Sequence, residues 1–272
     1  MGIVISVVQM KGGVGKTTCT VNLAANLAKD YKKKVLVVDF DPQINATLSL
    51  MTEKEWVSWD EKHGTMATIL EAERRKKDST TAFEDCVVKN AAGIEGLDLL
   101  PGHLKLTFLD LTLAARPGRE RLFARKTGKH LAKYDIVLCD CAPNLMTATQ
   151  NAIVASDYYL VPMQPDFLSS IGVKLLRSHI AYLREQLEHK VQCLGVLFSR
   201  VRKNVSFHEE TMRRLRKENP KIYFFKTVIP ENIKLGEAPA ESKPISLYDN
   251  QASGAEAFHE LTREFVKLLN LK

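Results

Sequence analysis

The stretch KGGVGKTT, residues 11–18, has the residue types and spacing for phosphate chemistry. Its glycines leave backbone N–H groups free to approach phosphate oxygens, and a helix that begins after the loop adds positive potential there. Lys16 can reach the β- and γ-phosphates of a nucleotide, and the Thr17 hydroxyl can bind Mg²⁺. The nucleotide-binding loop predicted from this pattern consists of Lys11, Gly12, Gly13, Val14, Gly15, Lys16, Thr17 and Thr18.

Three aspartates could complete such a site. Asp39 and Asp41 lie two residues apart in VVDFDPQ, so an extended chain would direct both side chains to one face, toward the phosphates. Asp140 ends the apolar run in DIVLCDCAP, the form of a Walker B motif. Its carboxylate is expected to hold Mg²⁺, usually through water.

The elements that must position these side chains are short β-branched runs that alternate with helical patterns. Strands are predicted at 3–9, 34–39, 96–101, 135–140, 158–163, 193–199 and 226–230, and helices at 17–30, 169–189 and 254–270. Several strands are apolar throughout, as strands buried on both faces are. This order predicts an α/β fold, a doubly wound and mostly parallel sheet with flanking helices, formed by residues 1–272 as a single domain.

Composition and charge restrict the class of protein. A hydrophobic fraction of 45% and a charged fraction of 26% are typical of a globular chain. The net charge of +7 favours polyanionic partners. Five cysteines without disulfide spacing, no secretory leader and no apolar run of about 18 residues predict a cytoplasmic protein. Residues 52–94 are expected to form helices and loops at the edge of the sheet.

The loop departs from the general pattern G-x-x-x-x-G-K-[ST] because the first glycine of that pattern is missing, and a lysine heads the loop. In this it resembles the ParA-type partition ATPases, of the ParA, Soj and MinD superfamily, whose deviant Walker A motif is KGGxxGK[ST]. The resemblance implies an ATP hydrolase that uses ATP and Mg²⁺ and forms a homodimer on ATP binding. It implies that Lys11 crosses the dimer interface to the phosphates of the other subunit, and that Lys11 and Lys16 act in catalysis.

Other positions follow from the same resemblance. Asp41 is expected to position the attacking water, and Asp39 to lie near the Mg²⁺ shell. Residues 226–266 look like the C-terminal signature of the family, which implies that Pro230 and Asn232 lie near the adenine. One departure is Glu231, because many relatives have an arginine there and use it on DNA.

Positive charge is concentrated between residues 200 and 226, where nine basic residues stand against three glutamates, a local excess of six. The residues predicted to bind DNA are Arg200, Arg202, Lys203, Arg213, Arg216 and Lys217. Family members bind DNA without sequence preference, and a ParB-type protein or another adaptor stimulates hydrolysis. The resemblance therefore implies a nucleoid-associated protein in plasmid partition, chromosome segregation or the positioning of another cargo.

Two alternatives remain at this point. A MinD-like ATPase would present a C-terminal amphipathic helix to a membrane, but FHELTREFVKLLNLK has the apolar spacing of a core helix, which makes membrane binding the less favoured hypothesis. A carrier of a metal cluster, like the nitrogenase iron protein, would need thiolates shared between subunits, and only Cys139 and Cys141 flank a relevant strand.

Overall fold

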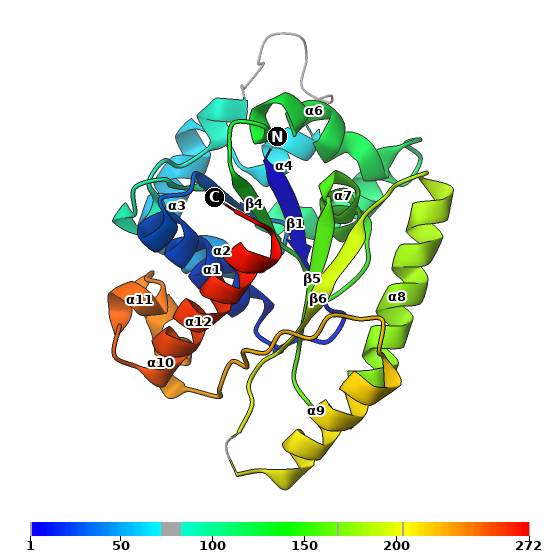
Figure 1. Cartoon of the computed structure of the whole chain (residues 1–272). Coiled ribbons are helices and arrows are strands. Elements are labelled where there is room, and N and C mark those ends of the chain that lie inside the picture. Colours follow the sequence, from blue (N-terminus) through cyan, green and yellow to red (C-terminus); the bar gives the residue numbers. More distant parts are fainter. Residues whose placement is uncertain (1, 72–82, 168, 203, 272) are drawn as a thin grey trace.

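The computed structural model describes residues 2–71, 83–167, 169–202 and 204–271. Six parallel strands form one sheet in the order β3-β2-β4-β1-β5-β6, with helices on both faces (Figure 1). The strands are β1 (Ile3–Val7), β2 (Val35–Asp39), β3 (Leu97–Leu100), β4 (Ile136–Asp140), β5 (Tyr158–Met163) and β6 (Gln192–Phe198). The predicted fold class, a doubly wound parallel sheet in a single domain, is confirmed.

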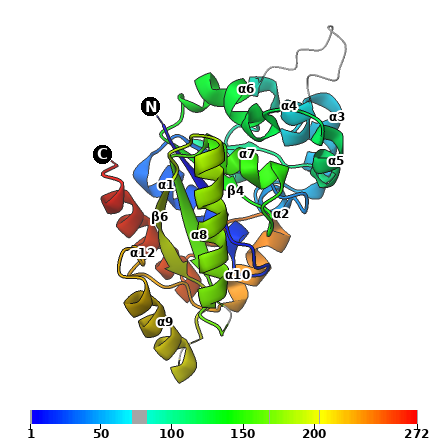
Figure 2. The same cartoon turned by 90° about the vertical axis from the view of Figure 1, so that its right-hand side faces the viewer.

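The core has two layers because strand residues alternate between the faces of the sheet. In β2, Leu36 and Val38 belong to one apolar cluster, and Val35 and Val37 to the other. Helices α6 (Leu122–Leu131), α7 (Thr147–Ala155) and α8 (Ser169–Gln186) cover the first face. Helices α1 (Lys16–Tyr31) and α12 (Ser253–Leu268) cover the second and contact each other (Figures 1 and 2).

The remaining helices lie outside these two covering layers or at their edges. They are α2 (Asn45–Leu48), α3 (Glu53–Lys62), α4 (Met66–Glu71), α5 (Leu109–Leu113), α9 (Ser206–Glu218), α10 (Ile233–Glu237) and α11 (Ile245–Tyr248), and the 3₁₀ turns η1 (Phe83–Cys86), η2 (Ala91–Gly93), η3 (Leu104–Phe108), η4 (Arg119–Arg121) and η5 (Ala238–Glu241). Between 52 and 94, the described residues form helices and loops, as expected; residues 72–82 of this span lie outside the described ranges. No described helix has the length and apolar character of a membrane span.

The prediction of a strand at 226–230 is wrong, although this segment does run beside β6. It forms only isolated bridges, such as Val201 with Pro230. The backbone N–H groups of Lys226 and Thr227 donate instead to the carboxylate of Glu264, at 2.8 and 3.0 Å. The Ile229 N–H still donates to Phe198 of β6, at 2.9 Å, but the donors of Lys226 and Thr227 are bound to α12, so the pairing with β6 is interrupted.

Candidate functional site

The predicted loop leaves the carboxyl end of β1, a central strand between β4 and β5. In open parallel sheets this edge is where ligands bind. Gly13 and Gly15 have positive φ angles of 72° and 82°, a conformation that glycine adopts without strain. Gly15 is the N-cap of α1, so the loop passes directly into a helix N-terminus.

The segment after β6 fixes this loop. The Ser199 hydroxyl donates to the carbonyl oxygen of Val14 at 2.6 Å, and the Arg200 guanidinium donates to that of Gly13 at 2.8 Å. Because these two carbonyl oxygens are bound by side chains, the shape of the loop is fixed and its N–H groups stay available for a ligand.

Lys16 is a buried cation, with 6% of its surface exposed. Its ammonium donates to the carbonyl oxygen of Lys11 at 3.3 Å and forms no ion pair within the described residues. Burial lowers the pKa of Lys16, and the charge of Asp140 opposes that shift. A buried ammonium without a paired carboxylate is costly, so an anionic ligand is favoured beside it.

Asp140 lies next to this lysine, fully buried at the end of β4. It accepts hydrogen bonds from the hydroxyls of Thr17, at 2.7 Å, and Thr20, at 3.1 Å. Burial raises the pKa of Asp140, while the bond from Thr17 lowers it. A cation bound between the Thr17 hydroxyl oxygen and the Asp140 carboxylate would therefore offset a buried negative charge.

The donor set suits Mg²⁺. A hydroxyl and a carboxylate are hard oxygen ligands, and Mg²⁺ is commonly held by one or two carboxylates together with substrate phosphates. Within the described residues no group of three His, Cys, Asp or Glu side chains could hold a metal by itself. Cys139 and Cys141 are fully buried, so neither thiol is placed to share a cluster with another subunit.

Asp39 and Asp41 do not face the same way, contrary to the expectation from their spacing. The Asp39 carboxylate accepts from the N–H and hydroxyl of Thr47, at 2.9 and 2.7 Å, and from the N–H of Asp41 at 3.1 Å. Asp41 lines the cavity and is 5% exposed. The side chains diverge because β2 ends at Asp39 and the chain then turns back on that carboxylate.

The cavity in front of the loop has a volume of about 850 Å³. The phosphate loop, Asp41, Pro230 and Asn232 all contribute to its lining, so distant segments named by the sequence meet there. Other lining residues were not predicted to bind the nucleotide: Gln43, Asn45, Ser199, Arg200, Leu235, Pro239 and Lys243. Arg200 was predicted to bind DNA instead, Gln43 ends the VVDFDPQ motif, and Leu235, Pro239 and Lys243 fall within the C-terminal signature. Asn45 and Ser199 carried no functional signal. Lys11 and Val14 are not part of the lining.

Lys11 instead forms an ion pair with Asp166, in the segment that follows β5. About half of the Lys11 side chain is exposed, at 49%. The second lysine of the loop is therefore at the surface of the single chain, held beside the site but not in it.

The predicted basic surface is only partly free. Arg200 and Arg202 both form ion pairs with Glu231. The Arg216 guanidinium donates to the Phe225 carbonyl oxygen at 3.2 Å and lies over the ring of Phe198. Arg213 and Lys217 are exposed on α9, which projects at one end of the molecule (Figures 1 and 2). Lys203 lies outside the described residues.

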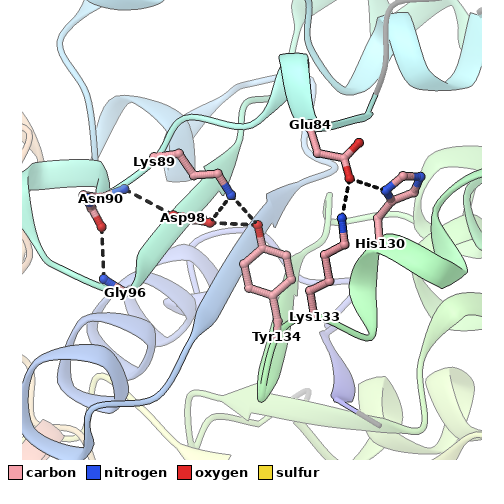
Figure 3. Close-up of polar contacts among 8 residues, drawn as sticks. All are labelled: Glu84, Lys89, Asn90, Gly96, Asp98, His130, Lys133 and Tyr134. Atoms are coloured by element: carbon pink, nitrogen blue, oxygen red, sulfur yellow. Dashed lines mark hydrogen bonds and ion pairs between the residues drawn. The ribbon is translucent and has the colours of Figure 1, made fainter.

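A second polar cluster, at the opposite edge of the sheet, has a structural explanation (Figure 3). Asp98, near the start of β3, accepts from Lys89 and from the Tyr134 hydroxyl, at 2.6 and 2.8 Å. Glu84 accepts from Lys133 at 2.7 Å, and this bond, with others, lowers the pKa of Glu84 to about 2. The cluster ties η1 and β3 to the segment between α6 and β4.

Comparisons with known proteins agree with this geometry. The family model for the AAA domain matches residues 2–193. The sporulation initiation inhibitor protein Soj of Bacillus subtilis is 33% identical over 266 residues, covering 97% of this chain and 98% of Soj. A plasmid partition protein of Borrelia burgdorferi bound to AMPPNP has a TM-score of 0.78 at 21% identity, covering 98% and 99% of the two chains. Cobyrinic acid a,c-diamide synthase of Mycobacterium smegmatis, with an ATP analogue and magnesium, has a TM-score of 0.80 at 23% identity, covering 100% and 96%.

Proposed function

Because this chain belongs to the family of ParA- and Soj-type partition ATPases, we propose that it is an ATP-driven switch that pairs two copies on DNA. Mg²⁺·ATP joins the copies, the dimer binds DNA without sequence preference, and hydrolysis releases it. The observation that carries this proposal is the buried Lys16 ammonium in a cavity beside the Thr17–Asp140 pair.

ATP occupies the cavity with its phosphates at the loop and its adenine toward Pro230 and Asn232. The N–H groups of residues 12–18 and the Lys16 ammonium bind the phosphate oxygens. Thr17 and Asp140 hold Mg²⁺, partly through water, and the ion supplies positive charge to the β- and γ-phosphates. The volume of the cavity and the presence of the loop, Pro230 and Asn232 in its lining support this placement.

Asp41 orients the water that attacks the γ-phosphate. Its near-complete burial and its position on the cavity wall support this role. Asp39 positions Asp41, because its hydrogen bonds to Thr47 and to the Asp41 N–H fix the turn that carries Asp41. Asp39 also stands opposite Asp140 on the neighbouring strand, so it lies near the Mg²⁺ shell while it positions Asp41.

Lys11 serves the nucleotide of the second copy. Two cations near one triphosphate stabilise the charge that develops on its oxygens during hydrolysis. A lysine donated by the other copy makes ATP part of the interface. The exposed position of Lys11 at the mouth of the site supports this role and requires that Lys11 leave Asp166 when the copies pair.

Pairing also explains how nucleotide could control DNA binding. Each copy contributes the basic segment around α9, so a dimer doubles the phosphate contacts, and affinity rises steeply because each contact releases counterions. A ParB-type or other adaptor would then trigger hydrolysis and release. We place this cycle on the nucleoid in the cytoplasm, in the partition of a plasmid, a chromosome or another cargo.

The MinD-like membrane function is the weaker alternative. Helix α12 buries Phe258, Leu261 and Phe265 in the core against the sheet and α1. An apolar face that is already packed cannot also enter a membrane without unfolding this layer.

Size-exclusion chromatography with ATP, ADP or no nucleotide, with and without duplex DNA, tests the cycle on the wild-type chain and on Asp41→Ala. The variant should keep ATP but hydrolyse it about 100-fold more slowly, because the water loses its orienting carboxylate. It should therefore accumulate as a dimer that co-elutes with DNA. ATP turnover at the wild-type rate in Asp41→Ala, or a monomer in every nucleotide state, would refute the scheme.

A further inference from the structure

One exposed carboxylate binds two of the arginines predicted to contact DNA. Glu231 accepts from Nε of Arg202 through one oxygen and from the guanidinium of Arg200, at 3.3 Å, through the other. The same Arg200 side chain donates to the carbonyl oxygen of Gly13 in the phosphate loop. The three charged side chains therefore form a bridge from the loop to the basic segment.

The backbone keeps this bridge in place. Val201 donates to the Ile229 carbonyl oxygen at 3.1 Å, and Glu231 donates to that of Val201 at 2.9 Å. Arg200 has a positive φ of 52°, which is uncommon for a residue other than glycine. Because two segments are fastened side by side, Glu231 faces the arginines as a fixed feature of the fold.

The bridge neutralises part of the positive charge on the surface that is predicted to bind DNA. Arg200 and Arg202 are 48% and 62% exposed, so a phosphate could reach either guanidinium. A carboxylate that already holds these donors must give them up to the phosphate and adds a negative charge close to it. The hydrogen bond from Arg202 lowers the pKa of Glu231, so the carboxylate stays ionised at neutral pH.

We propose that Glu231 sets the DNA affinity of this chain, by competing with DNA phosphate for Arg200 and Arg202. This inference rests on the proposed function and refines it. With Glu231 in place, a single copy binds DNA weakly, and stable binding requires the two basic segments of a pair. The carboxylate thus sharpens the dependence of DNA binding on dimerisation.

The test compares Glu231→Gln with the wild-type chain by fluorescence anisotropy on duplex DNA of random sequence, with ATP and Mg²⁺, over a series of NaCl concentrations. Glutamine keeps the size of the side chain and removes its charge. We expect affinity to rise roughly three- to tenfold. The plot of log affinity against log salt concentration should steepen by about one for each additional DNA phosphate that the variant neutralises.

Two further variants isolate the cause. Glu210→Gln removes the same charge from α9, where Glu210 makes no hydrogen bond or ion pair with the described residues, and it should change affinity less. Adding Arg202→Gln to Glu231→Gln should cancel the increase in affinity, because the released guanidinium is the group that binds phosphate.

The outcomes separate this inference from the proposed function. Equal affinity of Glu231→Gln and wild type at every salt concentration overturns the inference, while DNA binding by the wild type leaves the proposed function standing. Binding by Glu231→Gln alone supports the inference but contradicts the proposed function, because the ATP-bound wild-type chain should bind DNA. An absence of binding by both proteins overturns both.

Discussion

Lys16 illustrates how a single residue can be prepared for its ligand before the ligand arrives. Its side chain is buried among the loop, Asp140 and Asp41, and hydrogen-bonded only to the Lys11 carbonyl oxygen within the described residues. Little desolvation or ordering of this ammonium remains to be done when a phosphate binds. Such preorganisation is a principal source of affinity and of transition-state stabilisation.

Replacement of Lys16 should therefore affect binding more than folding. Lys16→Ala should lower ATP affinity about 100-fold, since charge-assisted hydrogen bonds of about 1.5–3 kcal/mol are lost. Isothermal titration calorimetry with a non-hydrolysable ATP analogue measures this loss. Lys29→Ala, in the last turn of the same helix, serves as the control and should bind normally. An unchanged ATP affinity in Lys16→Ala would show that Lys16 does not bind the nucleotide.

At the scale of single residues, the sequence predicts well the roles of residues that act within one short motif. It predicts poorly the contacts between residues that are far apart in the chain. The loop could be identified because its glycines, lysine and threonine act within a few consecutive residues. The different orientation of Asp39 was not foreseen, because it depends on a bond to Thr47 that only the turn after β2 creates. Ser199 and Arg200 were outside the predicted nucleotide site because their bonds to the loop cross more than 180 residues of chain.

At the scale of elements, Glu264 fastens α12 to the segment beside β6. Its carboxylate accepts from the Tyr223 hydroxyl at 2.6 Å, from the N–H groups of Lys226 and Thr227, and from the Thr227 hydroxyl. Partial burial acts to raise the pKa of Glu264, but these bonds together outweigh it and lower the pKa. Helix α12 thereby fixes the position of the segment that leads from Tyr223 to Pro230.

Glu264→Gln should destabilise the fold by about 1–2 kcal/mol at neutral pH, because charge-assisted bonds become weaker neutral ones. A carboxylate whose pKa is lowered by folding contributes stability above its unfolded pKa and loses it as pH falls through the folded value. The difference between variant and wild type should therefore shrink below about pH 4. Urea unfolding across this pH range, with Glu260→Gln as a control one turn earlier, measures it; a difference independent of pH would contradict the charge-based explanation.

The six sheet strands could be predicted because burial on both faces leaves a continuous apolar run in the sequence. The same reasoning failed at 226–230, where an apolar run lies beside the sheet but the N–H groups of Lys226 and Thr227 donate to Glu264. Strand formation there depends on a residue more than thirty positions away, and no local pattern contains that information.

At the scale of the whole molecule, the Lys11–Asp166 pair joins the loop after β1 to the segment after β5. In the proposed cycle it must open before Lys11 can reach a second copy. An exposed ion pair contributes at most about 1 kcal/mol, so it biases pairing without blocking it.

Asp166→Asn should accordingly strengthen the ATP-bound dimer about two- to fivefold, because the competing carboxylate is neutral. Sedimentation velocity over a range of protein concentrations gives the dimer dissociation constant. Asp166→Asn combined with Lys11→Ala should lose this increase. A weaker dimer in Asp166→Asn alone would mean that Asp166 itself contributes to the interface.

The strand order has a consequence for the newborn chain. The first of the six strands to be synthesised, β1, lies between β4 and β5, so both of its neighbours are made more than 130 residues later. Until then an apolar segment and the loop beside it have no sheet to join, and pairings across such long stretches of chain close slowly. Translation must therefore deliver β4 and β5 before β1 can be enclosed, which leaves this strand exposed to aggregation during synthesis.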